Sequence, residues 1–253
     1  MSKKNIYNRE LWKALYSMYV IQGKHFDEIA DTCGYSDPNV IGKVLESVEI
    51  HPGIRSDLYN SLSKIMLTDE QEQILLGSIL GDGCVLDRTS RNPIYTETHS
   101  IHQLDYLNWK QTRLYPFVNK VTIGHKGVDA QIRSVALHQL KYYRKVFYPD
   151  DKKIVPVETL EWLDALAIAV WYMDDGSITK ESGIIRIATC SFDMRTVGML
   201  QGWFAAKYGI LCYVRTDKGK YPTLVIQKES NDKFLKLVER YIISSMRYKL
   251  GQV

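Results

Sequence analysis

The segment that organises this chain is Gln73-Ile74-Leu75-Leu76-Gly77-Ser78-Ile79-Leu80-Gly81-Asp82-Gly83, an apolar stretch that ends in one acid and a glycine. A second version follows at Leu166-Ala167-Ile168-Ala169-Val170-Trp171-Tyr172-Met173-Asp174-Asp175-Gly176. The length and apolar content of each predict a buried helix that delivers Asp-Gly at its C-terminal end. Two such helices in one chain indicate an internal duplication whose acids, Asp82 and Asp175, meet at one place.

Two glycines predict how these helices pack. Gly77 and Gly81 are four residues apart and therefore share one helix face. Glycine costs a helix about 1 kcal/mol relative to alanine, so a compensating reason is needed, and close approach of another backbone supplies one. The small residues Ala165, Ala167 and Ala169 make the second helix the expected partner.

The composition is that of a globular protein. Of 253 residues, 45% are hydrophobic and 25% are charged, which excludes the disordered and fibrous classes. The net charge of +4 is a weak nucleic-acid signal. Four widely spaced cysteines without zinc-site spacing favour a reducing compartment. Because we find no signal peptide and no membrane-spanning apolar run, we expect a location in the cytoplasm or wherever the target DNA lies, and no membrane partner.

The same order of elements follows each apolar helix. After Asp82 the pattern predicts strands at 84–86 and 94–101, a helix at 103–118, strands at 120–124 and 131–137, and a helix at 138–147. After Asp175 it predicts strands at 177–179 and 183–190, a helix at 194–208, strands at 211–216 and 223–227, and a helix at 231–243. We therefore expect an α+β fold of two pseudo-symmetric αββαββα repeats, each with an antiparallel sheet that leaves one face open.

The residues before these repeats read as a small all-α domain. Residues 26–45 have the pattern helix, tight turn, helix, with Ala30 suited to a close crossing and Gly34 to a left-handed turn. The pattern resembles the helix-turn-helix of DNA-binding proteins, whose second helix would offer Asn39 and Lys43 to the major groove. A helical bundle that only packs against the rest of the chain is the alternative. The expected domains are 1–66, 67–157 and 158–253.

The two acids predict a cation site. A lone acid at a helix end is usually only solvated, but Asp82 and Asp175 both follow apolar helices, whose negative C-terminal dipole disfavours a further anion. If the helices pair, the two carboxylates repel each other and require a cation. Oxygen ligands favour Mg²⁺ or Mn²⁺.

At this point the chain resembles the LAGLIDADG homing endonucleases, in the single-chain form with two motifs. The first motif matches in Gly77, Ile79, Gly81 and the terminal Asp82-Gly83. The second resembles the Trp-aromatic-Met-Asp-Asp-Gly form of one branch of the family, at residues 171–176. The resemblance covers roughly residues 68–253 and implies two repeats of this family's fold.

The resemblance also implies a metal site. The acid before the last glycine of each motif binds the catalytic metals, which gives Asp82 and Asp175. The backbone carbonyls of the preceding residues, Gly81 and Asp174, would add ligands. The second copy departs from the pattern in Val170, where glycine is usual, and its extra acid Asp174 makes the ligand ambiguous. Asp175 is preferred because the glycine after it aligns with the one after Asp82.

In the same branch of the family, a lysine near the end of each repeat lies close to the scissile phosphate. Lys153 matches the first of these positions, with Lys152 as a competitor, and Lys249 matches the second. Their positive charge would stabilise the phosphorane or orient a water molecule. Either lysine could instead be a solvated surface residue.

Alternate polar residues on the open faces of the sheets are the expected contacts to double-stranded DNA. Each could instead be an ordinary solvated side chain. The candidates are Arg88, Arg91, Thr96, Thr98, Arg133, Lys180, Arg186, Arg215, Lys218, Lys220 and Gln227. Two sheets in one chain would cover a long, imperfectly palindromic site, so we expect a monomer.

These features favour a site-specific double-strand DNA endonuclease that depends on divalent metal. The resemblance implies a staggered cut with 3′ overhangs and a role in the mobility of an intron or an intervening gene. An RNA-splicing maturase that binds intron RNA is one alternative on the same fold. A DNA-binding transcription regulator is another, but such a protein should have lost the acids or the lysines, and all four are present.

Overall fold

The computed structural model describes residues 14–15, 18, 24–38, 40–41, 66–87, 92–217 and 221–251. The chain divides into two compact units, Met1–Ile65 and Met66–Val253. In the described residues, no helix is both long enough and apolar enough to cross a bilayer.

The first repeat begins with α5 and continues as a four-stranded antiparallel sheet with two helices. Its elements are α5 (Asp69–Leu80), β1 (Cys84–Leu86), β2 (Ile94–Ser100), α6 (Leu104–Arg113), β3 (Thr122–Ile123), β4 (Asp129–Arg133) and α7 (Leu140–Phe147). The strands lie in the order β1-β2-β4-β3. At the start of α5, the Thr68 hydroxyl accepts a hydrogen bond from Gln71 N, and the Gln71 side chain accepts one from Thr68 N.

The second repeat has the same topology. Its elements are α8 (Ala165–Asp175), β5 (Gly176–Ile178), β6 (Ile185–Ala188), α9 (Met194–Tyr208), β7 (Cys212–Asp217), β8 (Tyr221–Ile226) and α10 (Asn231–Val238). The strand order is β5-β6-β8-β7, again antiparallel. The predicted α+β fold with two αββαββα repeats is confirmed. Short 3₁₀ segments join the main elements, among them Pro149–Asp151, Val157–Trp162 and Ser244–Leu250.

Several predicted boundaries are wrong. The helix expected at 103–118 ends at Arg113, because Pro116 lacks an N–H and disfavours helical backbone just before it. The strands expected at 120–124 and 131–137 are Thr122–Ile123 and Asp129–Arg133. The last helix, expected at 231–243, ends at Val238 and is followed by a 3₁₀ turn.

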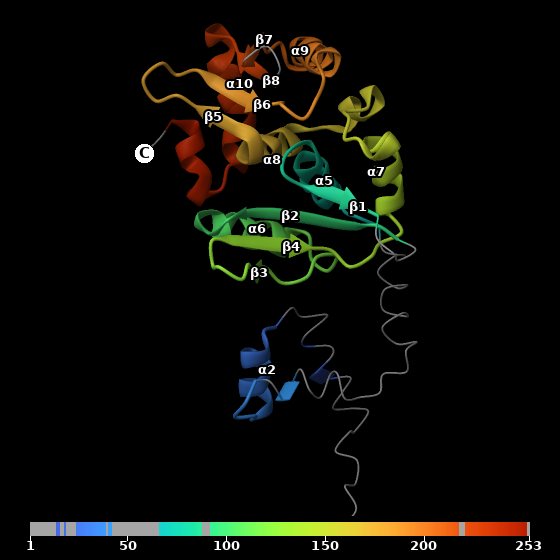
Figure 1. Ribbon diagram of the computed structural model, residues 1–253. Coiled ribbons are helices and arrows are strands. Elements are labelled where there is room, and N and C mark those ends of the chain that lie inside the picture. The colour runs from blue at the N-terminus through green and yellow to red at the C-terminus, as the bar shows by residue number, and fades with distance from the viewer. Residues whose placement is uncertain are drawn as a thin grey trace, which may run out of the picture. The chain divides into compact units, whose positions relative to one another are not determined.

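Helices α5 and α8 lie side by side at the centre of the larger unit (Figure 1). A Cβ atom added to Gly77 would lie 2.4 Å from Ala167 O and 2.7 Å from Val170 Cβ. One added to Gly81 would lie 2.5 Å from Asp174 Cβ. The predicted close pair is therefore confirmed, because Gly77 in α5 and Gly81 at its C-cap make room for the larger residues of α8.

Replacing Gly77 by alanine tests this packing. The added methyl group overlaps the α8 backbone, so we expect a net loss of about 1–3 kcal/mol in the free energy of unfolding. The matched control is Gly202→Ala on α9, where a Cβ meets no atom within 4 Å. There alanine should be neutral or stabilise by up to about 1 kcal/mol. Urea unfolding followed by circular dichroism measures both, and equal effects at the two sites would contradict the packing argument.

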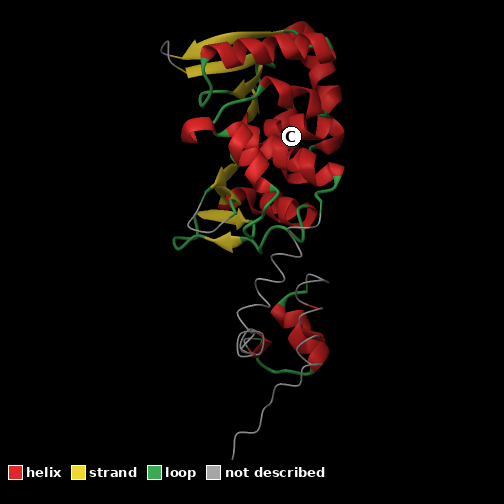
Figure 2. Ribbon diagram, turned by 90° about the vertical axis from the view of Figure 1, so that its right-hand side faces the viewer, coloured by secondary structure: helices red, strands yellow, loops and turns green. Residues whose placement is uncertain are grey.

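The strands of both sheets lie along one side of the larger unit and most of its helices along the other (Figure 2). Burial alternates along β2 accordingly. Tyr95, Glu97 and His99 are buried, whereas Thr98 and Ser100 between and after them are exposed. Each sheet thus keeps one face under helices and one face open.

In the smaller unit, α2 (Phe26–Cys33) ends at Gly34, whose φ of +73° is left-handed as predicted. Tyr35 N then donates to Ala30 O at 2.8 Å. Ala30 is buried in a small core with Leu15, Ile29 and Ile41. Binding of DNA by this unit stays a prediction, since Asn39 and Lys43 lie outside the described residues.

Candidate active site at the paired helix ends

The paired helices bring the two predicted acids to neighbouring helix ends. Asp82 follows α5 and keeps 44% of its side chain exposed. Asp175 is the last residue of α8 and is partly buried. Burial, followed by the negative charge of Asp82, raises the pKa of Asp175 to about 7. This mutual repulsion is the condition under which a bound cation stabilises a site.

The two predicted lysines occupy equivalent places at these helix ends. Lys153 Nζ donates to Gly81 O at 2.6 Å and to Gly83 O at 3.2 Å. Lys249 Nζ donates to the carbonyls of Met173 and, at 3.1 Å, Asp174. Each ammonium group therefore lies against the negative end of a helix dipole. Burial lowers the pKa of both lysines, whereas the competing Lys152 is exposed.

The carbonyl oxygens of Gly81 and Asp174 are thus already hydrogen-bonded to ammonium groups. A carbonyl oxygen has two lone pairs, so this contact leaves one available. Their role as metal ligands stays a prediction.

The carboxylate of Asp174, the neighbour of Asp175, forms hydrogen bonds with groups of the first repeat. Its carboxylate accepts from Lys110 Nζ at 2.9 Å, from Tyr106 Oη at 2.7 Å and from Asp82 N at 3.3 Å. The side chains of both Asp174 and Lys110 are completely buried. Burial nevertheless outweighs the opposite charge of Lys110 and raises the pKa of Asp174 to about 6.

Sequence reasoning missed the rest of this buried cluster. Lys110 Nζ also donates to Glu97 Oε1 at 2.5 Å and to Ser78 Oγ at 2.8 Å. Burial alone would raise the pKa of Glu97, but Lys110 and His99 hold it well below its ordinary value. Burial likewise opposes the charged form of Lys110, and the charges of Asp174 and Glu97 outweigh it, so its pKa is raised.

His99 connects this cluster to Asp82. Its Nε2 lies 2.5 Å from Glu97 Oε1, and its Nδ1 lies 3.1 Å from Gln103 Oε1 and 3.7 Å from Asp82 Oδ2. One ligand atom each of Asp82, His99 and Asp174 fall within 4.8 Å of one another, a spacing that could hold a metal ion. However, both ring nitrogens of His99 have protein partners, and Asp174 pairs with Lys110. We therefore interpret these residues as structural support for Asp82 and not as a second metal site.

Residues 72–234 match the model of a family described as the LAGLIDADG DNA endonuclease family. This chain belongs to that family. The resemblance inferred from the two motifs is thereby confirmed.

Some relatives of this LAGLIDADG protein are named as RecA proteins and others as intron-encoded endonucleases. It is 32% identical over 198 residues to protein RecA of Mycolicibacterium flavescens, which is 73% of this chain and 47% of the relative. The chain thus spans about half the length of this relative and of similar RecA proteins. It is 29% identical to "Probable intron-encoded endonuclease 1" of Wickerhamomyces canadensis, over 76% of this chain and 86% of that protein. Among solved structures, "The homing endonuclease I-WcaI bound to its DNA recognition sequence" has a TM-score of 0.72, 22% identity, and coverage of 82% of this chain and 96% of that chain.

The open sheet faces of this LAGLIDADG protein carry most of the described DNA-contact candidates. In the first sheet, Thr96 pairs with Arg133, and Thr98 pairs with Gln131, which donates to its hydroxyl. In the second sheet, Arg215 is exposed on β7, and Arg186 on β6 donates to Thr179. Lys180 is exposed in the turn after β5, and Gln227 follows β8. Four other candidates lie outside the described residues, namely Arg88, Arg91, Lys218 and Lys220.

Proposed function

We propose that this chain is a site-specific endonuclease that hydrolyses both strands of double-stranded DNA with the help of a divalent metal. The observation that carries the proposal is the pair of acids, Asp82 and Asp175, at adjacent helix ends with one lysine hydrogen-bonded to each end. Family membership and the name of the intron-encoded relative support the same reaction.

The residues at the helix ends fit a hard divalent cation. Asp82 and Asp175 offer carboxylate oxygens that repel each other in its absence, and burial together with the charge of Asp82 raises the pKa of Asp175. Such oxygen donors suit Mg²⁺ or Mn²⁺. When bound, the metal would supply Lewis-acid stabilisation of phosphate charge and a more acidic water molecule. Asp175 is the better second ligand because the carboxylate of Asp174 already accepts hydrogen bonds from Lys110 and Tyr106.

The chain's own residues would do the remaining work. The open faces of the two sheets would bind consecutive halves of a long, imperfectly palindromic DNA site, so that one chain suffices. Lys153 and Lys249 would present positive charge at the two helix ends, where it can stabilise the transition state of phosphate hydrolysis. The buried cluster behind Asp82 would hold that acid in place through the hydrogen bond from Asp82 N to Asp174.

Removal of the metal tests the proposed reaction. The protein is incubated with a library of DNA duplexes and Mg²⁺, and the ends produced are sequenced. We expect double-strand cuts at one sequence with 3′ overhangs, no cuts in EDTA, and recovery when Mg²⁺ or Mn²⁺ is added in excess. Undiminished cutting in EDTA would contradict the metal assignment. Absence of sequence-specific cuts under all metal conditions would contradict the proposed function.

A further inference from the structure

The two lysines at the helix ends are anchored in different ways. Lys249 belongs to the 3₁₀ segment Ser244–Leu250, in which Met246 and Leu250 are buried. Its carbonyl accepts a hydrogen bond of 2.7 Å from Tyr172 Oη on α8. Apolar packing and a buried hydrogen bond therefore hold the backbone from which Lys249 reaches the helix end.

Lys153 instead follows an exposed and unusual turn. Asp150 and Asp151 have φ values of 52° and 60°, in the left-handed region that side chains other than glycine rarely adopt. Aspartate tolerates this region better than most residues, but two in succession need support from outside the turn. Lys153 lies only two residues further on, so the path of this turn sets where its side chain starts.

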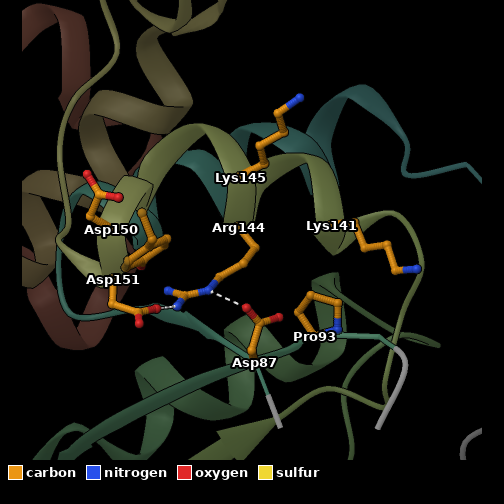
Figure 3. A pocket seen from close by; sticks show the side chains of 8 residues that line it. Asp87, Pro93, Lys141, Arg144, Lys145, Asp150 and Asp151 are labelled. Carbon is orange, nitrogen blue, oxygen red and sulfur yellow. Dashed lines mark hydrogen bonds and ion pairs between the residues drawn. The ribbon is translucent and has the colours of Figure 1, made fainter.

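Backbone hydrogen bonds hold part of this segment, including one of 2.8 Å from Ile154 N to Phe147 O, and one arginine on α7 adds side-chain links to the turn. Arg144 Nε donates to Asp87 Oδ2 at 3.0 Å, and its Nη2 donates to Asp151 Oδ1 (Figure 3). The guanidinium also lies over the ring of Tyr148, 5.0 Å from its centroid. Only 14% of the Arg144 side chain is exposed, although the two acids are largely solvated. Arg144 thus joins the end of β1 to the turn before Lys153.

We propose that Arg144 is a positioning residue for DNA cleavage: by joining Asp87 to Asp151, it fixes the backbone from which Lys153 reaches the end of α5. The inference rests on the proposed function, because it assigns a purpose to the placement of Lys153. Arg144 itself touches neither Asp82 nor Asp175 in the contacts described for its guanidinium group. Its effect on the position of Lys153 is transmitted through the turn that contains Asp151.

This arrangement makes the two half-sites unequal. Besides backbone hydrogen bonds, the segment that carries Lys153 relies on an ionic link across a partly solvated turn, whereas the segment that carries Lys249 relies on buried packing. If each helix end serves one DNA strand, loss of the Arg144 link should slow cleavage of one strand and spare the other. A general loss of folding would slow both strands together, so strand-resolved rates separate positioning from stability.

The test measures the cleavage rate of each strand separately, on a cognate duplex labelled at both 5′ ends. Arg144→Met removes the link, and Asp151→Asn removes only its charge, since asparagine also tolerates the left-handed backbone. Arg144→Lys is the conservative variant: a single ammonium group cannot reproduce the forked contact to both acids. The control is Arg113→Met. This change breaks the half-exposed ion pair between Arg113 Nη1 on α6 and Glu70 Oε1 on α5.

We expect Arg144→Met and Asp151→Asn to slow one strand by about tenfold or more and the other by less than about twofold, with accumulation of nicked DNA. Arg144→Lys should be intermediate, while Arg113→Met and the DNA affinity of all variants should stay near the parent. Equal slowing of both strands, or no slowing of either, overturns the inference. If Arg144→Met does not fold, Asp151→Asn decides by the same criteria. If the parent cuts neither strand, both the proposed function and this inference are wrong.

Discussion

Asparagine in place of Asp82 or Asp175 should lower the rate of DNA cleavage by a factor of about 10³ or more, which is about 4 kcal/mol of transition-state stabilisation. Asparagine keeps the size of the side chain but removes the charge that a divalent cation requires. DNA affinity should change little, because the side chains expected to contact DNA lie on the open faces of the sheets and are unchanged in these variants. Cleavage assays on the cognate duplex with Mg²⁺ and a binding assay with Ca²⁺ measure the two quantities separately.

Two comparisons make this result specific. Asp105→Asn, at an exposed position in the first turn of α6, should cut like the parent. Asp175→Asn should not destabilise the metal-free protein, because burial and the charge of Asp82 already oppose ionisation of Asp175. Asp174→Asn, in contrast, should cost stability, since it leaves Lys110 with less negative charge around it. If Asp82→Asn and Asp175→Asn cut as well as the parent, the catalytic assignment is wrong.

Lys110→Met should lower the free energy of unfolding by about 3–5 kcal/mol. The ammonium group of Lys110 is fully buried between the carboxylates of Glu97 and Asp174. Removing the cation takes the ammonium partner from two buried acids and leaves only His99 and neutral donors described beside them, whereas the methionine side chain fills nearly the same volume. Chemical denaturation monitored by tryptophan fluorescence measures the loss.

A second substitution identifies the cause. Glu97→Gln in the Lys110→Met background removes one of the uncompensated charges and should restore part of the lost stability. The control Lys145→Met, on the exposed face of α7, should change stability by less than about 0.5 kcal/mol. A cost below about 1 kcal/mol for Lys110→Met would show that the buried pair contributes little beyond packing.

The helix pair explains why the second motif can depart from the usual pattern. Val170 of α8 is larger than the glycine usual in the family pattern and lies over Gly77, and Asp174 lies over Gly81 at the C-cap of α5. Asp174 uses that space to reach Lys110 and Tyr106 in the first repeat. The extra acid is therefore a structural link between the repeats, and it leaves Asp175 as the acid at the helix end.

Much of this architecture was predictable because it depends on local patterns. The two apolar segments with terminal Asp-Gly predicted α5 and α8, and Gly77 and Gly81 predicted their close approach. Helix α9 was predicted to the residue, because an N-cap aspartate and a C-terminal glycine bound it clearly. Boundaries failed where a proline or a short 3₁₀ turn ended an element early.

The sequence by itself determined the duplication, the paired helix ends and the positions of both acids and both lysines along the chain. Only the tertiary structure decided that Asp174 pairs with Lys110, that His99 lies beside Asp82, and that Arg144 links Asp87 to Asp151. Alternation along β2 does place Glu97 and His99 on the covered face with Tyr95, so the sequence contained one indication of the buried cluster. Periodicity reports which face a side chain occupies, but the charge state of a buried group depends on partners that only folding brings together.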